Sequence, residues 1–278
     1  MQVVRSRAEL RAALAAAGRP VGLIPTMGWL HAGHVSLAER ARAECATVVL
    51  SIFVNPRQFG DASDFERYPR NAGRDLALAG AAGVDLVFAP GVEDVYPPGF
   101  DTVVRVGAIA EPLEGAARAG HFDGVATVVA ILLSLVGAER VYFGLKDYQQ
   151  VAVIRQMVLD LGLASEIVPC ATVREDDGLA LSSRNGRLSP TGRAAAPVLH
   201  RALLAGATLI ATGERDAGAV RTAMGGVLAT EPMADPEYVS VADRVTLREL
   251  HEVGPAGALL SLAVRIDGVR LIDNEVVG

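Results

Sequence analysis

The stretch that decides the fold is VGLIPTMGWLHAGHVSLAERARAE, residues 21–44. It begins with an apolar run, residues 21–24, which predicts a buried strand, and it ends with residues 35–44, which predict a helix. Between the two elements lie His31 and His34, at a predicted strand-to-helix turn. Because they are three residues apart at the start of a helix, the two imidazoles are expected on one face of it.

A turn of this kind suits an anion. The first N–H groups of a helix have no partner inside the helix, and the positive end of the helix dipole lies there. Phosphate binds readily at such a position. Gly28 and Gly33 leave room for a ligand beside the backbone, and an imidazole can donate a hydrogen bond to a phosphate oxygen. We therefore predict a phosphate site; the alternative is that the histidines only cap the helix or lie on the surface.

Composition restricts the class of protein. The chain has 278 residues, 51% of them hydrophobic, which is enough for a large core and a second domain. A net charge of −6 and a pI near 5.4 argue against a nucleic-acid partner, which needs a basic face. No signal peptide is expected, because Arg5, Arg7, Glu9 and Arg11 interrupt any apolar stretch near the start of the sequence. No membrane partner is expected, because no uninterrupted apolar run reaches the roughly 18 residues of a bilayer span. Cys45 and Cys170 show no metal-ligand spacing, so we expect reduced thiols and a cytoplasmic location.

The alternation of apolar runs and helical stretches predicts an α/β fold. Strands are predicted at 21–24, 47–54, 84–88, 140–143 and 167–168, with helices from Ser6 to Gly18 and at 35–44, 72–82, 125–136 and 147–161. Such an order is typical of a parallel sheet with helices on both faces, whose ligands lie beyond the carboxyl ends of the strands.

The character of the chain changes after about residue 173. Two helical stretches, 190–211 and 217–229, precede three predicted strands, 237–242, 258–266 and 269–276. The last two strands are joined by Asp267-Gly268, a two-residue hairpin signal. We therefore predict two domains, residues 1–173 and a smaller α+β domain of residues 174–278.

A second chemical segment, FGLKDYQQ at residues 143–150, leaves a predicted strand and enters a helix. Lys146 is the single lysine among 26 basic residues. A lone lysine among arginines suggests a position that needs a compact, rotatable positive charge, such as a position that contacts a phosphate. Asp147 can accept hydrogen bonds from ribose hydroxyls, and Gln150 lies one turn further on. The alternative is that Asp147 caps the helix beside a solvated lysine.

Two weaker segments complete the set. LSSRN, residues 181–185, offers two hydroxyls and a guanidinium to phosphate oxygens from a flexible loop; the alternative is an ordinary polar loop. FVNPRQFG, residues 53–60, follows the strongest predicted strand, and Gln58 offers a donor and an acceptor to a polar substrate; the alternative is a plain turn at Asn55-Pro56.

Several common motifs are missing from the sequence. There is no G-x-x-x-x-G-K-[S/T] loop, no G-x-G-x-x-G fingerprint and no G-x-S-x-G elbow. The histidines lack the spacing of a zinc site. We therefore expect neither a covalent enzyme nucleophile nor a tightly bound organic cofactor.

The four segments together resemble one family. Residues 25–34, 53–60, 143–150 and 182–185 look like the signature of the pantothenate synthetase (pantoate–β-alanine ligase) family, in the family's order. The H-x-G-H element alone is shared by the wider nucleotidyltransferase superfamily. The resemblance implies a Rossmann-like domain, a smaller mobile C-terminal domain that closes over the active site, and a homodimer. It implies that ATP, with Mg²⁺, and pantoate give pantoyl adenylate and pyrophosphate, and that β-alanine then releases AMP and pantothenate.

The resemblance also implies roles for single residues. ATP would be contacted by Met27, Gly28, Trp29, Leu30, His31, Ala32, Gly33, His34, Gly144, Leu145, Lys146, Asp147, Val173, Leu181, Ser182, Ser183 and Arg184. The implied catalytic residues are His34 as proton donor, His31 and Lys146 on the phosphates, and Arg184. Gln58 and Gln150 would hold pantoate, and Gln58 would also meet β-alanine. No protein ligand of Mg²⁺ is implied clearly, because Arg74 stands where the family tends to have an acid, and Leu145 replaces a usual glutamate.

Two alternatives remain open at the level of sequence. Another H-x-G-H enzyme that forms adenylates, such as a relative of the aminoacyl-tRNA synthetases, would share the histidine turn. The acidic pI and the absence of an evident tRNA-binding segment argue against it. An ATP-binding regulatory module without catalysis is the other alternative, and the presence of both histidines and the lone lysine argues against that.

Overall fold

The computed structural model describes residues 1–60 and 62–278, which form two compact units. The N-terminal unit holds residues 1–145 and 149–171. The C-terminal unit holds residues 172–278 together with a short insert from the first part of the chain, Lys146–Tyr148. Each unit has its own sheet and its own core, and each is described by itself.

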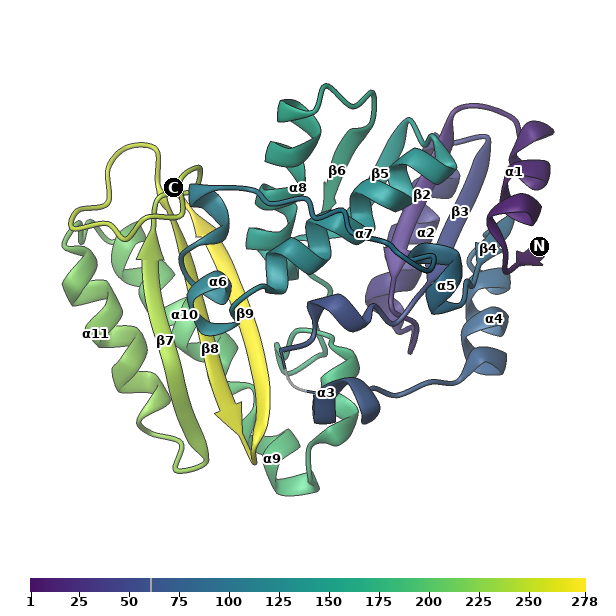
Figure 1. The fold of residues 1–278 in the computed structure, drawn as a ribbon. Helices are drawn as coiled ribbons and strands as arrows, with labels where there is room; N and C mark the ends of the chain where they lie inside the picture. Colours follow the sequence, from purple (N-terminus) through teal and green to yellow (C-terminus); the bar gives the residue numbers. More distant parts are fainter. Residues whose placement is uncertain (61) are drawn as a thin grey trace. The chain divides into compact units, whose positions relative to one another are not determined.

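A six-stranded parallel sheet forms the N-terminal unit (Figure 1). Its strands are β1 (Gln2–Val4), β2 (Val21–Thr26), β3 (Thr47–Ile52), β4 (Leu86–Phe88), β5 (Arg140–Gly144) and β6 (Glu166–Cys170), in the order β1-β4-β3-β2-β5-β6. β2 pairs with β3 on one side and β5 on the other. The carboxyl ends of these three neighbouring strands therefore lie at one edge of the sheet, as the predicted parallel sheet requires.

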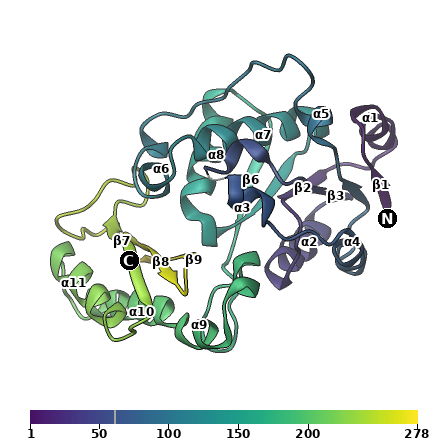
Figure 2. The same cartoon turned by 60° about the horizontal axis from the view of Figure 1, so that its bottom comes forward.

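Helices cover both faces of this sheet, which confirms the predicted fold class (Figure 2). The core on one face includes residues of α1 (Arg7–Ala15), α7 (His121–Val136) and α8 (Tyr148–Asp160). The core on the other face includes residues of α2 (Ala32–Glu44) and α4 (Ala72–Ala81). Successive strand residues point to opposite faces, so Leu23 packs in the first core and Ile24 in the second.

Short elements connect these layers. They are the helices α3 (Ala62–Glu66), α5 (Val92–Val95) and α6 (Glu114–Ala117), and the 3₁₀ turns η1 (Pro56–Gln58), η2 (Ala108–Ala110) and η3 (Leu145–Asp147). α1 begins with a capping box: Ser6 Oγ accepts from Glu9 N at 3.2 Å, and Glu9 Oε2 accepts from Ser6 N at 3.2 Å. The short strand β1 was not predicted, because three residues are too few to show a period.

The C-terminal unit is an antiparallel sheet with helices on one face. Its strands are β7 (Ala234–Ala242), β8 (Ala258–Ile266) and β9 (Val269–Val277), in that order. α10 (Val198–Ala211) and α11 (Ala217–Leu228) share a core with Leu260 and Leu262 of β8. The predicted hairpin turn is confirmed, since Asp267 and Gly268 have φ of +53° and +72°, as a type I′ turn requires.

One predicted helical stretch, residues 190–211, is divided. α9 (Pro190–Ala195) and α10 are separated at Ala196-Pro197, because proline has no N–H to continue the helical ladder. By length and composition alone this stretch could cross a membrane, but half of its most apolar window is buried. Leu199 and Leu203 lie in the core that α10 shares with the sheet, so the apolar face of this stretch already has a partner inside the unit.

A half-buried histidine packs against a glycine in the C-terminal unit. His200 of α10 lies against Gly178, where an added Cβ would be 2.3 Å from the imidazole Cδ2. Within residues 1–60 and 62–278, His200 Nδ1 has no hydrogen-bond partner. Burial, and then the charge of Arg174, hold the pKa of His200 below its usual value, while Asp273 and Glu275 oppose this.

We predict that this imidazole lowers stability in acid. The unfolded chain binds a proton near pH 6.5, whereas the folded chain resists it, so the free energy of unfolding should fall as the pH drops below about 6.5 toward the lowered pKa. Urea unfolding at pH 8 and pH 5.5 should show a smaller loss for His200→Gln than for the unchanged chain. His251→Gln, which removes an exposed imidazole from the same unit, is the matched control. An equal acid loss in His200→Gln and the unchanged chain would contradict this interpretation.

Candidate active site

The histidine turn joins the end of β2 to the start of α2. α2 begins at Ala32, three residues before the predicted start, because His31 itself is the N-cap. His31 Nδ1 accepts from Gly33 N at 3.2 Å, and His34 Nδ1 accepts from His31 N at 3.3 Å. The two rings have their centroids 4.1 Å apart. The predicted pairing of the imidazoles on one helix start is therefore confirmed, and it takes the form of a capping box made of two histidines.

These caps determine where each imidazole carries its proton. In both rings Nδ1 accepts a hydrogen bond from a backbone N–H, so in the neutral form the proton lies on Nε2. Each Nε2 is then a donor at the N-terminus of α2, where donors and the helix dipole favour an anion. The capping alternative and the phosphate-binding hypothesis thus use different nitrogens of His31 and His34, and they are compatible.

A buried carboxylate accepts two hydrogen bonds from the backbone of the histidine turn. Asp75, in the first turn of α4, is 2% exposed. Its two oxygens accept from Trp29 N and Leu30 N, both at 2.8 Å. Gly28 and Trp29 have φ of +82° and +51°, the left-handed conformation that turns both N–H groups toward the carboxylate. An added Cβ at Gly28 would lie 3.0 Å from Asp75 Oδ2, so the glycine is also needed for space.

Arg74, the residue before Asp75, also contacts the histidine turn. The Arg74 guanidinium lies over the Trp29 ring, with Cζ 5.0 Å from the ring centroid. Its nearest approach to Asp75 Oδ1 is 3.8 Å. The basic residue at position 74 therefore supports the histidine turn by a cation–π contact, while both oxygens of the acid at position 75 accept backbone hydrogen bonds.

Gln58 is brought next to the histidine turn. β3 ends at Ile52, two residues earlier than predicted, and the chain then enters η1. The Gln58 amide accepts from Asn55 Nδ2 at 2.9 Å, and its Nε2 lies 3.2 Å from Met27 Sδ. The structure therefore joins two of the predicted segments, and Asn55 fixes which end of the Gln58 amide faces Met27.

Asn55, which sequence reasoning considered only as part of the alternative plain turn, is a buried residue at the centre of a hydrogen-bond network. It is 1% exposed, and its Oδ1 accepts from Tyr96 OH at 2.7 Å and from Arg57 N at 3.2 Å. Burial raises the pKa of Tyr96 to about 12, against the charge of Arg57 and the Asn55 hydrogen bond, which both lower it. Tyr96 therefore keeps its proton and remains a donor. An asparagine directly after a buried strand was the available signal.

The third segment follows β5, the other neighbour of β2. Gly144 ends that strand, and Leu145–Asp147 form η3, so α8 begins at Tyr148, one residue after the predicted Asp147. The Lys146 side chain is 17% exposed, with Nζ 3.7 Å from Asp147 Oδ1. Within the C-terminal unit, Lys146 O accepts from Asn274 Nδ2 at 2.7 Å. Gln150 is half-buried on α8.

The remaining predicted residues lie in the C-terminal unit. Leu181 N donates to Val173 O at 2.9 Å, so the two residues implied to border adenine are neighbours. Ser182 caps the 3₁₀ turn η4 (Ser183–Arg187), and its Oγ accepts from Arg184 N at 3.2 Å. The predicted flexible loop is thus a capped turn, in which Ser183 and Arg184 are half-buried.

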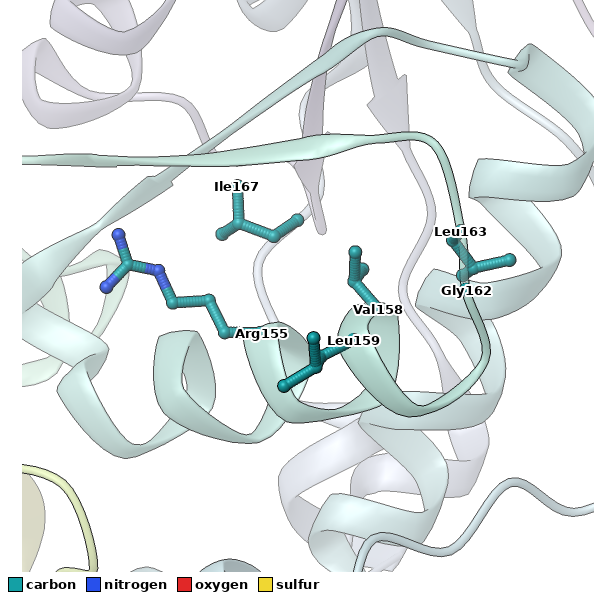
Figure 3. A pocket seen from close by; sticks show the side chains of 6 residues that line it. All are labelled: Arg155, Val158, Leu159, Gly162, Leu163 and Ile167. Carbon is teal, nitrogen blue, oxygen red and sulfur yellow. The ribbon is translucent and has the colours of Figure 1, made fainter.

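A shallow hollow of about 360 Å³ lies elsewhere in the N-terminal unit (Figure 3). It is lined by Arg155, Val158, Leu159, Gly162, Leu163 and Ile167, and so by the end of α8 and the start of β6. Arg155 is the only charged residue in this lining, and no predicted site residue belongs to it. The hollow therefore adds nothing to the candidate active site.

Comparison with known proteins decides the family. Residues 2–276 match the family model described as Pantoate-beta-alanine ligase. The chain belongs to this family. A pantothenate synthetase of Chloroflexus aggregans is 61% identical over 274 residues, which cover 99% of each chain. A pantothenate synthetase of Roseiflexus castenholzii is 57% identical over 277 residues, covering 100% of this chain and 99% of the relative.

Solved structures of the pantoate-β-alanine ligase family share the fold. A crystal structure of pantothenate synthetase from Thermus thermophilus matches with a TM-score of 0.95 at 52% identity, covering 99% of each chain. A pantoate-β-alanine ligase from Francisella tularensis, solved with β-γ ATP and β-alanine, matches with a TM-score of 0.82 at 32% identity, covering 99% of this chain and 97% of the other. The resemblance, the fold class and the ligase class predicted from the sequence are therefore confirmed.

We predict that Asp75→Ala disrupts the histidine turn. It leaves Trp29 N and Leu30 N without their acceptor, at about 1–3 kcal/mol for each buried donor. Urea unfolding should show a lower free energy of unfolding, and activity should fall with it. Arg74→Ala removes only the half-exposed partner of Trp29 and should cost less than about 1 kcal/mol. Equal stability of the two variants would show that Asp75 does not hold the turn.

Proposed function

We propose that this chain condenses pantoate with β-alanine, using ATP and passing through pantoyl adenylate. Family membership supports the activity, and a relative solved with β-γ ATP and β-alanine supports these two substrates. The observation that carries the site is topological. Residues with suitable chemistry follow β3, β2 and β5, which are neighbours in one parallel sheet, at the edge where such sheets bind ligands.

In the first step we assign substrate positioning and charge neutralisation to the protein. The pantoate carboxylate is ionised near neutral pH, so it needs no general base. One of its oxygens forms a bond to the α-phosphorus, and the bond from that phosphorus to the bridging oxygen breaks, so that pyrophosphate leaves. His31 and His34 donate from Nε2 to phosphate oxygens, and Lys146 and Arg184 neutralise the developing charge. Preorganised donors of this kind support the proposed roles because the caps fix both imidazoles.

Gln58 and Gln150 hold pantoate in this proposal. The Gln58 amide is oriented by Asn55, which favours a defined substrate contact. In the second step the neutral amine of β-alanine attacks the acyl carbon, the bond to the AMP oxygen breaks, and the amine loses a proton. AMP leaves with the electron pair of that bond, and pantothenate is formed. Asp147 binds ribose hydroxyls, and Val173 and Leu181 border adenine.

We treat Mg²⁺ as part of the ATP substrate. Among residues 1–60 and 62–278, no group of three or more His, Cys, Asp and Glu side chains could hold a metal ion. Asp75 already accepts a backbone N–H at each oxygen, which supports an anchoring role over a ligand role. We also propose a homodimer, which the family resemblance implies, and a cytoplasmic location, which the free thiols of Cys45 and Cys170 support.

The test is ATP–pyrophosphate exchange. We expect isotope exchange that depends on pantoate and Mg²⁺, because adenylate formation is reversible and releases pyrophosphate. Exchange that depends on an amino acid instead would support the alternative of another adenylate-forming enzyme. Tight ATP binding without exchange for any acid would support a regulatory module, and either result would overturn our assignment.

We predict that Lys146→Arg reduces pantoate-dependent exchange by about 10²-fold or more. Arginine keeps the charge but replaces a compact ammonium by a planar fork, and a well-placed contact to the reacting phosphates contributes about 2.7–4 kcal/mol. The measurement is the exchange rate at saturating ATP and pantoate. Arg201→Lys, the reverse exchange at an exposed position of α10, is the matched control and should leave the rate unchanged. Full activity of Lys146→Arg would refute the proposed role.

A further inference from the structure

We propose that His121 is a positioning residue for Gln58, and so for pantoate, and that it acts through its contact with the Gln58 backbone. His121 is the first residue of α7 and is 8% exposed. Its Nδ1 lies 2.8 Å from the backbone oxygen of Gln58, 63 residues earlier in the chain. This inference rests on the proposed function, because it takes from it the role of Gln58 in holding pantoate.

The contacts of His121 fix its protonation. A carbonyl oxygen can only accept, so Nδ1 must carry a proton and donate it to Gln58 O. The other nitrogen, Nε2, lies 3.0 Å from Arg118 Nη1, and a guanidinium can only donate. His121 is therefore a neutral imidazole with its proton on Nδ1. This is the opposite tautomer from the one that the caps assign to the two histidines of the β2–α2 turn.

A second side chain supports the same carbonyl. Arg118 Nη2 donates to Gln58 O at 3.3 Å, while its Nη1 donates to the imidazole. Its charge is opposed by Glu114, whose Oε2 is 3.6 Å from Arg118 Nη1 and which is itself buried. The imidazole thus lies between a carbonyl and an ion pair. Its ring orientation is determined by partners on both nitrogens.

The backbone of α7 forms the remaining support. An added Cβ at Gly124 would lie 2.2 Å from Arg57 O and 2.8 Å from Gln58 N, so helix and turn are in direct backbone contact there. Gly124 O also accepts from Asn55 Nδ2 at 3.1 Å. The first turn of α7 therefore packs against the Gln58 backbone, hydrogen-bonds its oxygen through His121 and, through Asn55, orients its side chain. A small shift of η1 would displace the amide from pantoate, and displacements near 1 Å can reduce rates about 10²-fold.

Two substitutions separate positioning from general support of the fold. In His121→Asn, the side-chain amide N–H takes nearly the place of Nδ1–H and can still donate to Gln58 O. His121→Leu keeps a buried apolar side chain but removes the donor. We expect the Leu variant to raise the KM for pantoate about tenfold or more in the exchange assay, with the KM for ATP within about twofold of the original. The Asn variant should recover most of this loss.

The outcomes distinguish this inference from the proposed function. No pantoate-dependent exchange in the unchanged chain would overturn the proposed function itself. Exchange in the unchanged chain with an unaltered pantoate KM in His121→Leu would overturn only the positioning role. An equal rise in both KM values, or no recovery by Asn, would assign His121 to the fold. If His121→Leu does not fold, His121→Gln, which displaces the donor from Gln58 O, must show the same selective rise. His251→Leu at an exposed position is the matched control.

Discussion

The candidate site depends above all on the carboxylate of Asp75. Gly28 and Trp29 are in the left-handed conformation, and the buried carboxylate accepts from the N–H groups that follow, those of Trp29 and Leu30. Such a backbone would be costly without that acceptor. The carboxylate thus sets the path of the chain from the end of β2 to His31. The start of α2, and the direction of both imidazoles, depend on that path.

A buried polar side chain also fixes the turn at the end of β3. Asn55 satisfies a tyrosine hydroxyl, a backbone N–H, a backbone carbonyl and the amide of Gln58 while being almost wholly buried. Fully satisfied polar networks in a core specify one arrangement, because every misplacement leaves a buried group without a partner. In both places the side chain proposed to bind a ligand is on a turn, whereas the group that fixes its position comes from a regular element or is buried behind it. In this way buried groups fix the position of side chains that lie on turns.

Sequence was sufficient for the architecture because its signals are local. The apolar runs before the histidine turn and before Gly144 predict strands, and the Asp267-Gly268 pair predicts the hairpin, each from neighbouring residues alone. The supporting groups could not be found in this way. Asp75 lies 46 residues from Trp29 and looks like an ordinary acid in the first turn of a helix, where acids are common. His121 is likewise separated by 63 residues from the carbonyl that it contacts. Contacts of this range follow from packing and leave no periodic pattern.

The histidine capping box has a consequence for the design of related proteins. Asparagine, aspartate or serine at position 31 would cap α2 at least as well, since these residues are the strongest N-caps known. None of them would present a second nitrogen to a ligand. Redesign for stability alone would therefore favour replacing the imidazole, and would remove the proposed phosphate donor without any visible defect in the fold. The proposed phosphate contact of His31 would account for a weaker cap at this helix start.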